Sequence, residues 1–530
     1  MRFAVLLALL LPLAAPAAPP YPPEVVPGVL VIVGGGKMPD EARKEFVKLA
    51  GGEDAKLIVV PTASAAADEP KDAEAFTKPW TDAGVKSVTL FHTRDRKLAD
   101  DAEFVKPLTT ATAVWFSGGD QSKVTAAYAG TKAEAEFKKV LARGGVVGGT
   151  SAGAALMSDL MIAGGTDTAT TATGLGFLPG VVVDQHFTQR NRLKRLEGVI
   201  AKNPEYVGLG LDEGAAVMLK QGRFLQVVGG NVTVCLAKSP TKPAMAEASG
   251  KGALDLFQLR RAAHFRAAKE QFPPAKAAVP EVKKGSLVIV GGGGAGPEIW
   301  KKFIELAGGP EAKLVFIATA LDDPVPINAG EVTALARYGA KNVTVLHTRD
   351  RKKADDAEFS QALTEAKGVW FSGGRQWRFV DSYEGTLTAK RIRAVLDGGG
   401  VIGGSSAGAS IQAEYMPRGH PLGNTVMAAE GYERGFGYLP GCAVDQHFFA
   451  RKRTADMTGL MKLYPQLLGV GIDEGTAVVV TGTTAEVIGK SKVGFYDYRT
   501  KPTDGEPDFT EVKTGESYDL KGRAKVEAKK

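Results

Sequence analysis

The chain contains the same domain-sized pattern twice, and this duplication limits its possible folds more than any other feature. GGTSAGA begins at Gly148 and GGSSAGA begins at Gly403, 255 residues later. Val33 corresponds to Val290 at a shift of 257, and the two DQHF stretches lie 261 residues apart. A repeat of roughly 220 residues is a whole domain, because solenoid units are much shorter. We therefore predict two tandem copies of one domain, the second with six extra residues after its serine turn (261 − 255).

Each copy opens with the same order of elements. In the first copy, GVLVIVGGG (28–36) predicts a strand, 39–52 an amphipathic helix, and 56–64 the next strand. The second copy restarts this order at residue 285. Continuous aliphatic strands in a β-α-β order favour a parallel sheet covered on both faces. We therefore expect α/β domains.

Five segments are expected along the chain: a signal peptide at 1–18, a first domain at 24–250, a linker with a helix at 251–284, a second domain at 285–498 and a polar tail at 499–530. Arg2 precedes a short apolar run, and Ala15-Pro16-Ala17 fits a signal-peptidase site. The run is too short to serve as a permanent membrane anchor. We expect export to the periplasm or the extracellular space, with no anchor after cleavage.

Composition argues against several classes of partner. The formal net charge is only +7 over 530 residues, and no basic stripe is interleaved with aromatic residues, so no nucleic-acid partner is expected. Cys235 and Cys442 lie at non-equivalent places in the two copies, so two buried free thiols are expected rather than a disulfide. No His/Cys cluster has metal-ligand spacing, and we expect neither a metal nor another cofactor.

Ser151 and Ser406 lie where a predicted strand turns into a predicted helix. A G-x-S-x-G turn pushes the serine hydroxyl out of the strand line, beside the free N–H groups of the next helix. A glycine-rich turn without chemistry is the alternative. The presence of the turn in both copies favours a nucleophile.

A serine nucleophile needs a base and a group that orients the base. Only the histidine pairs 92/347 and 186/447 occur at equivalent places, and the second pair follows an aliphatic run in DQHF. The HTRDR setting of His92 is typical of a structural turn, so it is the weaker candidate. The orienting carboxylate is one of Asp184, Asp212 and Glu213, or one of Asp445, Asp473 and Glu474 in the second copy.

Two further features suggest how a substrate would be held. Arg190, Arg192 and Arg195 follow the DQHF histidine, either as a solvated basic face or as guanidinium groups that hold a carboxylate. The GGDQ turn supplies glycine N–H groups that could form an oxyanion hole with the N–H of Ala152.

Taken together, GGTSAGA, FSGGDQ, DQHFTQRNRLKRL and LDEGAAV resemble the cyanophycinase family of serine peptidases, which also includes the α-aspartyl dipeptidases (peptidase S51). The resemblance covers each copy almost from end to end. It implies a flavodoxin-like, class I glutamine-amidotransferase-like three-layer sandwich in each copy. It also implies cleavage of cyanophycin, a poly-aspartate that bears arginine on its side chains, to β-Asp-Arg dipeptides.

The resemblance also implies residue roles. The triad would be Ser151, His186 and Glu213, with Ser406, His447 and Glu474 in the second copy. The oxyanion hole would comprise Gly119 and Ala152, with Gly374 and Ala407. The substrate pocket would be lined by Gln121, Asp184, Gln185, Arg190, Arg192 and Arg195, and in the second copy by Gln376, Asp445, Gln446, Arg451 and Arg453.

The second copy departs from the first in the expected pocket. Asp120 is replaced by Arg375, and Arg195 by Asp456. Charge reversals around a bound substrate would change what binds. We therefore expect that the first copy cleaves cyanophycin, and that the second has altered specificity, is inactive or packs as the partner in an intramolecular pseudo-dimer.

Three other readings compete with this one. An exopeptidase for other isoaspartyl or acidic peptides would use the same triad. A nucleotide-binding protein is weakly indicated by the G-x-G-x-x-G spacing of Gly291, Gly293 and Gly296, but no acidic ribose partner follows the next strand. A non-catalytic binding protein is disfavoured by triad candidates in both copies.

Overall fold

The computed structural model describes residues 27–250, 252–326, 330–500, 502 and 507–527. The expected signal peptide, residues 1–18, lies outside these ranges. Within them, no helix is both long enough and apolar enough to cross a membrane. Cys235 and Cys442 are buried free thiols.

The first copy is built on an eight-stranded sheet with the order β14-β11-β10-β1-β5-β4-β2-β3. Neighbouring strands from β1 to β3 in this order run parallel, and β10, β11 and β14 extend the sheet antiparallel. The strands are β1 (Val29–Val33), β2 (Lys56–Val60), β3 (Ser87–Leu90), β4 (Ala113–Phe116), β5 (Val146–Thr150), β10 (Ala215–Lys220), β11 (Phe224–Gly229) and β14 (Gly252–Asp255).

Helices cover both faces of the parallel part of this sheet. Phe46 of α1 (Asp40–Ala50) and Trp80 of α2 (Ala73–Thr81) pack against Trp115 on one face. On the other face, Phe137 of α6 (Lys132–Ala142) packs against Phe116, beside α4 (Ala102–Thr110) and α5 (Gln121–Tyr128). Trp115 and Phe116 are consecutive in β4, so they point to opposite faces. This produces the expected helix–sheet–helix layers.

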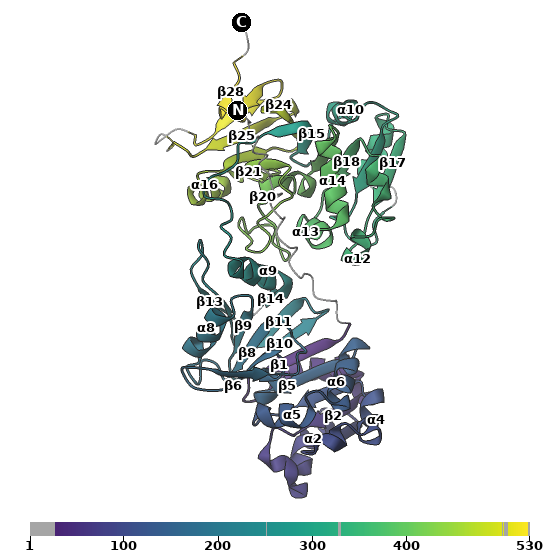
Figure 1. Cartoon of the computed structure of the whole chain (residues 1–530), viewed down its shortest axis with the longest axis vertical. Helices are drawn as coiled ribbons and strands as arrows, with labels where there is room; N and C mark the ends of the chain where they lie inside the picture. Colours follow the sequence, from purple (N-terminus) through teal and green to yellow (C-terminus); the bar gives the residue numbers. More distant parts are fainter. Residues whose placement is uncertain (1–26, 251, 327–329, 501, 503–506, 528–530) are drawn as a thin grey trace, which may run out of the picture.

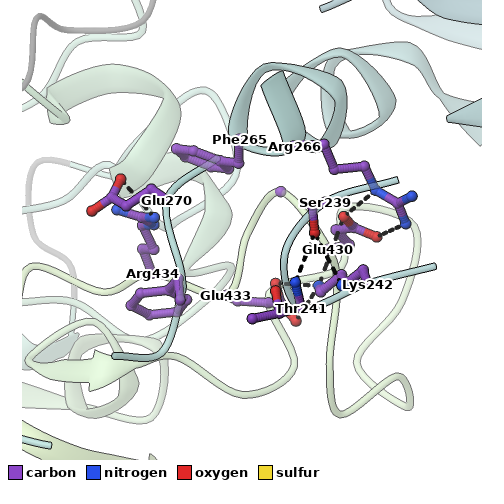
Figure 2. A pocket seen from close by; sticks show the side chains of 11 residues that line it. Ser239, Thr241, Lys242, Phe265, Arg266, Glu270, Glu430, Glu433 and Arg434 are labelled. Atoms are coloured by element: carbon purple, nitrogen blue, oxygen red, sulfur yellow. Dashed lines mark hydrogen bonds and ion pairs between the residues drawn. The ribbon is translucent and has the colours of Figure 1, made fainter. Parts of the chain in front are cut away.

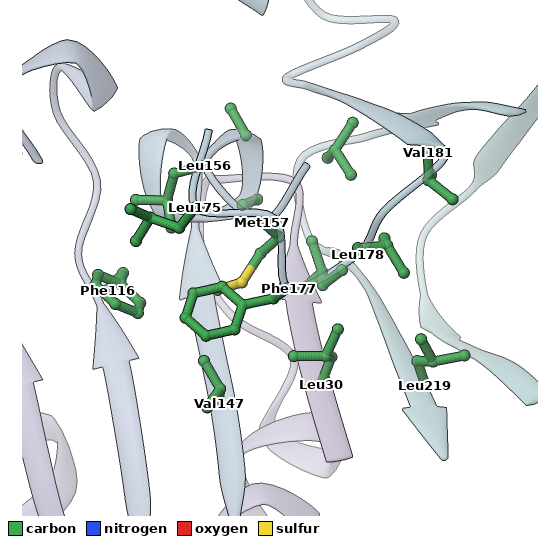
Figure 3. Close-up of a cluster of buried hydrophobic side chains, with 14 of the residues drawn as sticks. Leu30, Phe116, Val147, Leu156, Met157, Leu175, Phe177, Leu178, Val181 and Leu219 are labelled. Atoms are coloured by element: carbon green, nitrogen blue, oxygen red, sulfur yellow. The ribbon is translucent and has the colours of Figure 1, made fainter. Parts of the chain in front are cut away.

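A second, smaller sheet lies beside the large one and was not expected from the sequence. Its order is β13-β12-β9-β8, formed by β13 (Met245–Ser249), β12 (Val232–Leu236), β9 (Val207–Leu211) and β8 (Val181–Gln185). Val181 of β8 joins the core that contains Leu30 and Leu219 of the large sheet (Figure 3). On the outer face, Leu196 of α8 (Leu193–Lys202) packs against Val182 and Phe187.

The second copy repeats both sheets. Its large sheet has the order β17-β16-β18-β19-β15-β23-β24-β27-β28, and its small sheet the order β20-β21-β22-β25-β26. The strands are β15 (Val282–Val290), β16 (Lys313–Ile317), β17 (Asn342–Leu346), β18 (Gly368–Phe371), β19 (Val401–Ser405), β20 (Ala413–Tyr415), β21 (Leu439–Asp445), β22 (Leu468–Ile472), β23 (Thr476–Gly482), β24 (Thr484–Gly489), β25 (Lys492–Asp497), β26 (Thr510–Lys513), β27 (Ser517–Asp519) and β28 (Ala524–Lys525). The expected α/β class and the duplication are both confirmed.

The segment 499–530, expected to be a polar tail, instead contributes strands to the second copy. β26 pairs with β25 in the small sheet, and β27 pairs with β24 in the large one. Tyr518 and Leu520 are buried in the core. Leu520 donates its N–H to Thr483 O at 2.8 Å, as Leu256 does to Arg223 O at 2.8 Å, so this segment is the counterpart of β13 and β14. Few residues of the segment 499–530 are apolar, so the sequence did not indicate these strands.

A helix with buried arginines joins the two copies. The helix expected after residue 250 is α9 (Leu256–Ala267), which lies between the two domains (Figure 1). Arg261 donates to the Gly431 carbonyl and to Glu384 of the second copy, both at 2.7 Å. Arg266 binds both carboxylate oxygens of Glu430, at 2.7 and 2.9 Å (Figure 2). The basic residues of this segment thus hold the domains together.

The contacts between the copies join non-equivalent surfaces. Arg223 binds Asp255 at 2.6 Å and Asp381 of the second copy at 2.7 Å, and its guanidinium lies 4.2 Å from the ring centre of Trp377. The counterpart of Arg223 is Thr483, and that of Asp381 is Ala126 (381 − 255). Because the partners are not repeated, these contacts do not show the pseudo-dimer expected from the sequence.

Replacing Arg223 with alanine should lower the free energy of unfolding by about 3 kcal/mol, because the buried Asp255 carboxylate would lose its charged partner. Urea unfolding followed by tryptophan fluorescence measures the change. Thr483→Ala is the matched control, since it alters the equivalent position of the second copy, and should change stability by less than about 0.5 kcal/mol. Equal effects of the two substitutions would contradict the structural role given to Arg223.

Candidate active site

Ser151 lies at the turn between β5 and the short helix α7 (Ala152–Ala155), with a positive φ of 53°. Ser406 has the same conformation in the second copy, with a φ of 55°. A positive φ in a residue with a side chain is strained, at a cost of roughly 1–3 kcal/mol. A methyl group on Gly149 would overlap the Gly153 backbone, which explains the small residues around the serine.

A histidine from the small sheet meets this serine from the large sheet. His186 follows β8, and its Nε2 lies 2.8 Å from Ser151 Oγ. Its Nδ1 lies 2.5 Å from Glu213 Oε1. In the second copy the distances are 2.9 Å from His447 to Ser406 and 2.5 Å from His447 to Glu474. The same Ser–His–Glu chain of hydrogen bonds therefore occurs twice.

The other two carboxylates considered from the sequence have different partners. Asp212 accepts hydrogen bonds from the N–H and the hydroxyl of Thr188, at 3.1 and 2.8 Å, and so holds the turn after His186. Asp184 is buried and binds Arg195 and Arg192. Of the three, Glu213 is the one that contacts the histidine.

The glycine turn after β1 positions His186 and Glu213, a role that the sequence reasoning missed. Gly34 O accepts the N–H of His186 at 2.7 Å, and Gly35 O accepts that of Gly214 at 3.0 Å. A methyl group on Gly35 would overlap the imidazole ring. A Cβ on Gly36 would lie 3.1 Å from Glu213 Cβ.

The same turn accounts for Gly291 and Gly293, the first two glycines of the spacing that suggested a nucleotide site. In the second copy, Gly291 O accepts the N–H of His447 at 2.6 Å. A methyl group on Gly292 would overlap the His447 ring, and a Cβ on Gly293 would lie 2.6 Å from Glu474 Cβ. The glycines at 291–293 are therefore required by the packing of this site.

The residues before the glycines expected in an oxyanion hole, Gly118 and Gly373, lie beside the serines. A Cβ on Gly118 would be 3.9 Å from Ser151 Oγ, and in the second copy a Cβ on Gly373 would be 3.7 Å from Ser406 Cβ. The next residues, Gly119 and Gly374, have φ of 139° and 129°. Ala152 and Ala407 begin the helices after the two serines. The oxyanion hole of Gly119 and Ala152, with Gly374 and Ala407 in the second copy, stays a prediction.

Most residues expected to line the substrate pocket are buried or half-buried and are paired with protein groups. Arg195 Nε donates to Asp184 at 3.0 Å, and Arg192 donates to Gln185 Oε1 at 2.6 Å. Gln121 donates to the carbonyls of Ile162 and Ala163, at 2.8 and 3.2 Å. Arg190 is exposed, one turn after His186. In the second copy, Arg451 is exposed, whereas Gln376, Asp445, Gln446 and Arg453 are buried.

The expected charge reversals of the second copy are compensated within the protein. Arg418 binds Asp445 at 3.0 Å and Asp456 at 2.6 Å, so it supplies the guanidinium that Arg195 supplies in the first copy. Arg375 donates to the His420 and Pro421 carbonyls, at 3.0 and 3.1 Å. Arg375 and Arg418 therefore both fix the longer loop between β20 and β21, and the two residues whose charges differ from the first copy, Arg375 and Asp456, have partners within the protein.

The second copy also has a titratable carboxyl beside its glycine turn. Glu331 of α11 (Gly330–Arg337) accepts the N–H of Gly373 and the indole N–H of Trp370, both at 3.2 Å. Burial raises the pKa of Glu331 to about 7. Its counterpart in the first copy is Phe76 (331 − 255), so the surroundings of the two serines differ at this point.

Within the described ranges, no group of three or more His, Cys, Asp or Glu side chains is placed to hold a metal ion.

Comparison with known proteins identifies relatives of each half of the chain. The model of peptidase family S51 matches residues 30–227 and again 287–488. A cyanophycinase of Geminocystis herdmanii is 32% identical over 230 residues, which cover 42% of this chain and 84% of the relative. A cyanophycinase of Synechococcus elongatus is 34% identical over 245 residues, which cover 44% of this chain and 76% of the relative. The crystal structure of a peptidase from an acI-B1 actinobacterium is 25% identical, with a TM-score of 0.35, and the match covers 44% of this chain and 97% of that one.

Gly35→Ala should abolish reaction at Ser151, because the added methyl group displaces the His186 ring. We expect at least a 100-fold slower labelling of Ser151 by a fluorophosphonate, measured by mass spectrometry in a Ser406→Ala background. Gly198→Ala is the control, since a Cβ there meets open space, and it should label at the parent rate. Normal labelling of the Gly35 variant would show that the position of the His186 ring does not depend on a glycine at residue 35.

Labelling of Ser406 in a Ser151→Ala protein should persist to lower pH than an ordinary histidine would allow. Burial lowers the pKa of His447, so the imidazole stays neutral, and able to accept a proton, below the ordinary value of 6.5. The rate of fluorophosphonate labelling between pH 4.5 and 8 should therefore have its midpoint below 6.5. Glu474→Gln should lower the midpoint further, because it removes the carboxylate that stabilises the charged imidazole. A midpoint above the ordinary value would contradict this reading.

Proposed function

The chain belongs to peptidase family S51 and is a serine-type peptidase, and from this premise we propose that its first copy hydrolyses cyanophycin through Ser151, His186 and Glu213. The observation that carries the proposal is the unbroken chain of hydrogen bonds from the serine hydroxyl through the imidazole to the carboxylate, at 2.8 and 2.5 Å. Named cyanophycinases 32 and 34% identical to this chain support the choice of substrate class.

The reaction follows from this geometry. Ser151 Oγ attacks the scissile carbonyl carbon while His186 Nε2 takes the hydroxyl proton. The Glu213 carboxylate holds the ring by Nδ1 and stabilises the imidazolium that forms. The N–H groups of Gly119 and Ala152 would bind the oxyanion. The imidazolium then gives its proton to the leaving amine, and a water molecule, deprotonated by the same histidine, hydrolyses the acyl-enzyme.

Arg190 is the residue we propose for substrate recognition. Its guanidinium is exposed, and its backbone N–H donates to His186 O at 3.1 Å, so it lies next to the base. Cyanophycin presents carboxylates, which a guanidinium can bind through two parallel hydrogen bonds. The other arginines and Gln185 are committed to buried partners, so their contribution would be to shape the wall behind the histidine.

We propose that the second copy is also a hydrolase, with a different specificity. Its serine, histidine and glutamate have nearly the same separations as in the first copy. The loop between β20 and β21 is longer and is fixed by Arg375 and Arg418, which would change the entrance to the site. Shorter isoaspartyl or acidic peptides are therefore the candidate substrates. Export to the periplasm or beyond, directed by residues 1–18, is part of the same proposal.

Separate Ser151→Ala and Ser406→Ala variants test the assignment. Release of β-Asp-Arg from purified cyanophycin, followed by mass spectrometry, should fall at least 1,000-fold in Ser151→Ala and remain within about threefold of the parent in Ser406→Ala. A panel of isoaspartyl dipeptides should show the reverse pattern. Full cyanophycin cleavage by Ser151→Ala would refute the role of the first copy.

A further inference from the structure

The repeated HTRDR motif is not part of the Ser–His–Glu chain, yet it makes the same unusual set of contacts in both copies. Arg94 donates from Nη1 to the Thr62 carbonyl at 2.5 Å and from Nη2 to the Ser64 carbonyl at 2.9 Å. These carbonyls belong to the loop that follows β2. A guanidinium that binds two backbone carbonyls fixes the path of the chain between them.

A carboxylate and a histidine complete the set. Asp68 accepts from Arg94 Nε at 3.1 Å and from Nη2 at 3.0 Å. His92 lies between Asp68 and the Thr62 hydroxyl, at 3.0 and 2.9 Å. The Thr62 hydroxyl also contacts the buried Tyr128 hydroxyl at 2.9 Å. Arg94 and His92 thus tie both ends of the loop, residues 62–68, to the segment after β3.

The other side of this loop touches the glycine turn beside the nucleophile. Ala63, between the two carbonyls held by Arg94, accepts the N–H of Asp120 at 2.9 Å. A methyl group on Gly119 would overlap the Ala63 carbonyl, so the two backbones are in direct contact. The orientation of the peptide groups on both sides of Gly119 therefore depends on where Ala63 is held.

The second copy preserves these contacts although its loop has a different sequence. Arg349 donates to the Thr319 and Leu321 carbonyls, at 2.8 and 2.6 Å, and to Asp323 at 2.8 Å. Ala320 accepts the N–H of Arg375 at 3.0 Å, and a methyl group on Gly374 would overlap its carbonyl. The loop reads PTASAAAD in the first copy and ATALDD in the second, whereas HTRDR is unchanged.

We propose that Arg94 and Arg349 are positioning residues that hold this loop against Gly119 and Gly374 and so aim their N–H groups at the oxyanion. The inference rests on the proposed function, since it assigns a purpose to a charged cluster only if an oxyanion forms at the serine. It requires that loss of the guanidinium fork lowers kcat more than it raises KM, because the misplaced N–H matters most when negative charge develops.

Arg94→Lys in a Ser406→Ala background tests the proposal, with Arg96→Lys as the matched control. Lysine keeps the charge but cannot bind two carbonyls in a fork. Arg96 belongs to the same motif and also donates to two carbonyls, those of Ala126 and Ala129, which lie at the other end of α5 from Gly119. The control therefore reports any general effect of disturbing the motif.

For cyanophycin hydrolysis by Arg94→Lys, we expect a kcat about 10- to 100-fold lower than that of the parent, with a KM within about threefold of the parent value. The affinity for a peptide boronate, which forms a tetrahedral adduct with the serine, should fall by the same factor as kcat. Arg96→Lys should match the parent in all three quantities. Equal losses in the two variants, or a change confined to KM, would overturn the proposal. Failure of the Ser406→Ala parent itself to label with a fluorophosphonate would instead reject the proposed function.

Discussion

The active site depends on one close approach, between the backbone that follows β1 and the imidazole that follows β8. The serine is carried by the large sheet and the histidine by the small one, so the two must be brought to a hydrogen-bond distance by the packing of the sheets. The N–H of His186 is held by Gly34 O at 2.7 Å, and its ring lies where a side chain of residue 35 would otherwise be. The next glycine leaves room for Glu213. A single turn without side chains thus fixes the base relative to both of its partners.

Both copies place an arginine against the buried aspartate behind the histidine of the Ser–His–Glu chain, but the arginine comes from a different segment of the chain in each copy. Behind the histidine, a buried aspartate needs a guanidinium, because an unpaired buried carboxylate is costly. Arg195 from α8 meets this need in the first copy, and Arg418 from the loop after β20 meets it in the second. Asp456 occupies the position of Arg195 in the second copy, and its side chain accepts a hydrogen bond from Arg418. In the sequence, the change from Arg195 to Asp456 looks like a reversed charge in the substrate pocket. In the structure, the ion pair of the buried aspartate is retained, with Arg418 in place of Arg195.

The elements that sequence reasoning could predict are those with a strong local signal. Aliphatic runs that end in glycine turns located the parallel strands, and the duplication picked out Ser151 and His186 as a pair. The choice among Asp184, Asp212 and Glu213 could not be made, since it depends on which side chain the glycine turn admits. The burial of Arg195 could not be predicted either, because a charged residue is buried only where a partner distant in the sequence is available. The strands of segment 499–530 were missed because each is only two to four residues long, and the segment places few apolar residues in the core, among them Val512, Tyr518 and Leu520.

The joint between the domains also bears on how whole molecules behave toward one another. A surface that fits an unlike surface on the next copy can, in principle, be repeated without limit and yield fibres. Here the donor side requires Arg223 and the acceptor side requires Asp381, and each occurs in one copy only, with Thr483 and Ala126 at the matching positions. Once the first domain has docked on the second, the chain has used its single donor side and its single acceptor side. The difference between the copies at these positions therefore leaves no second donor or acceptor of this kind for a neighbouring molecule.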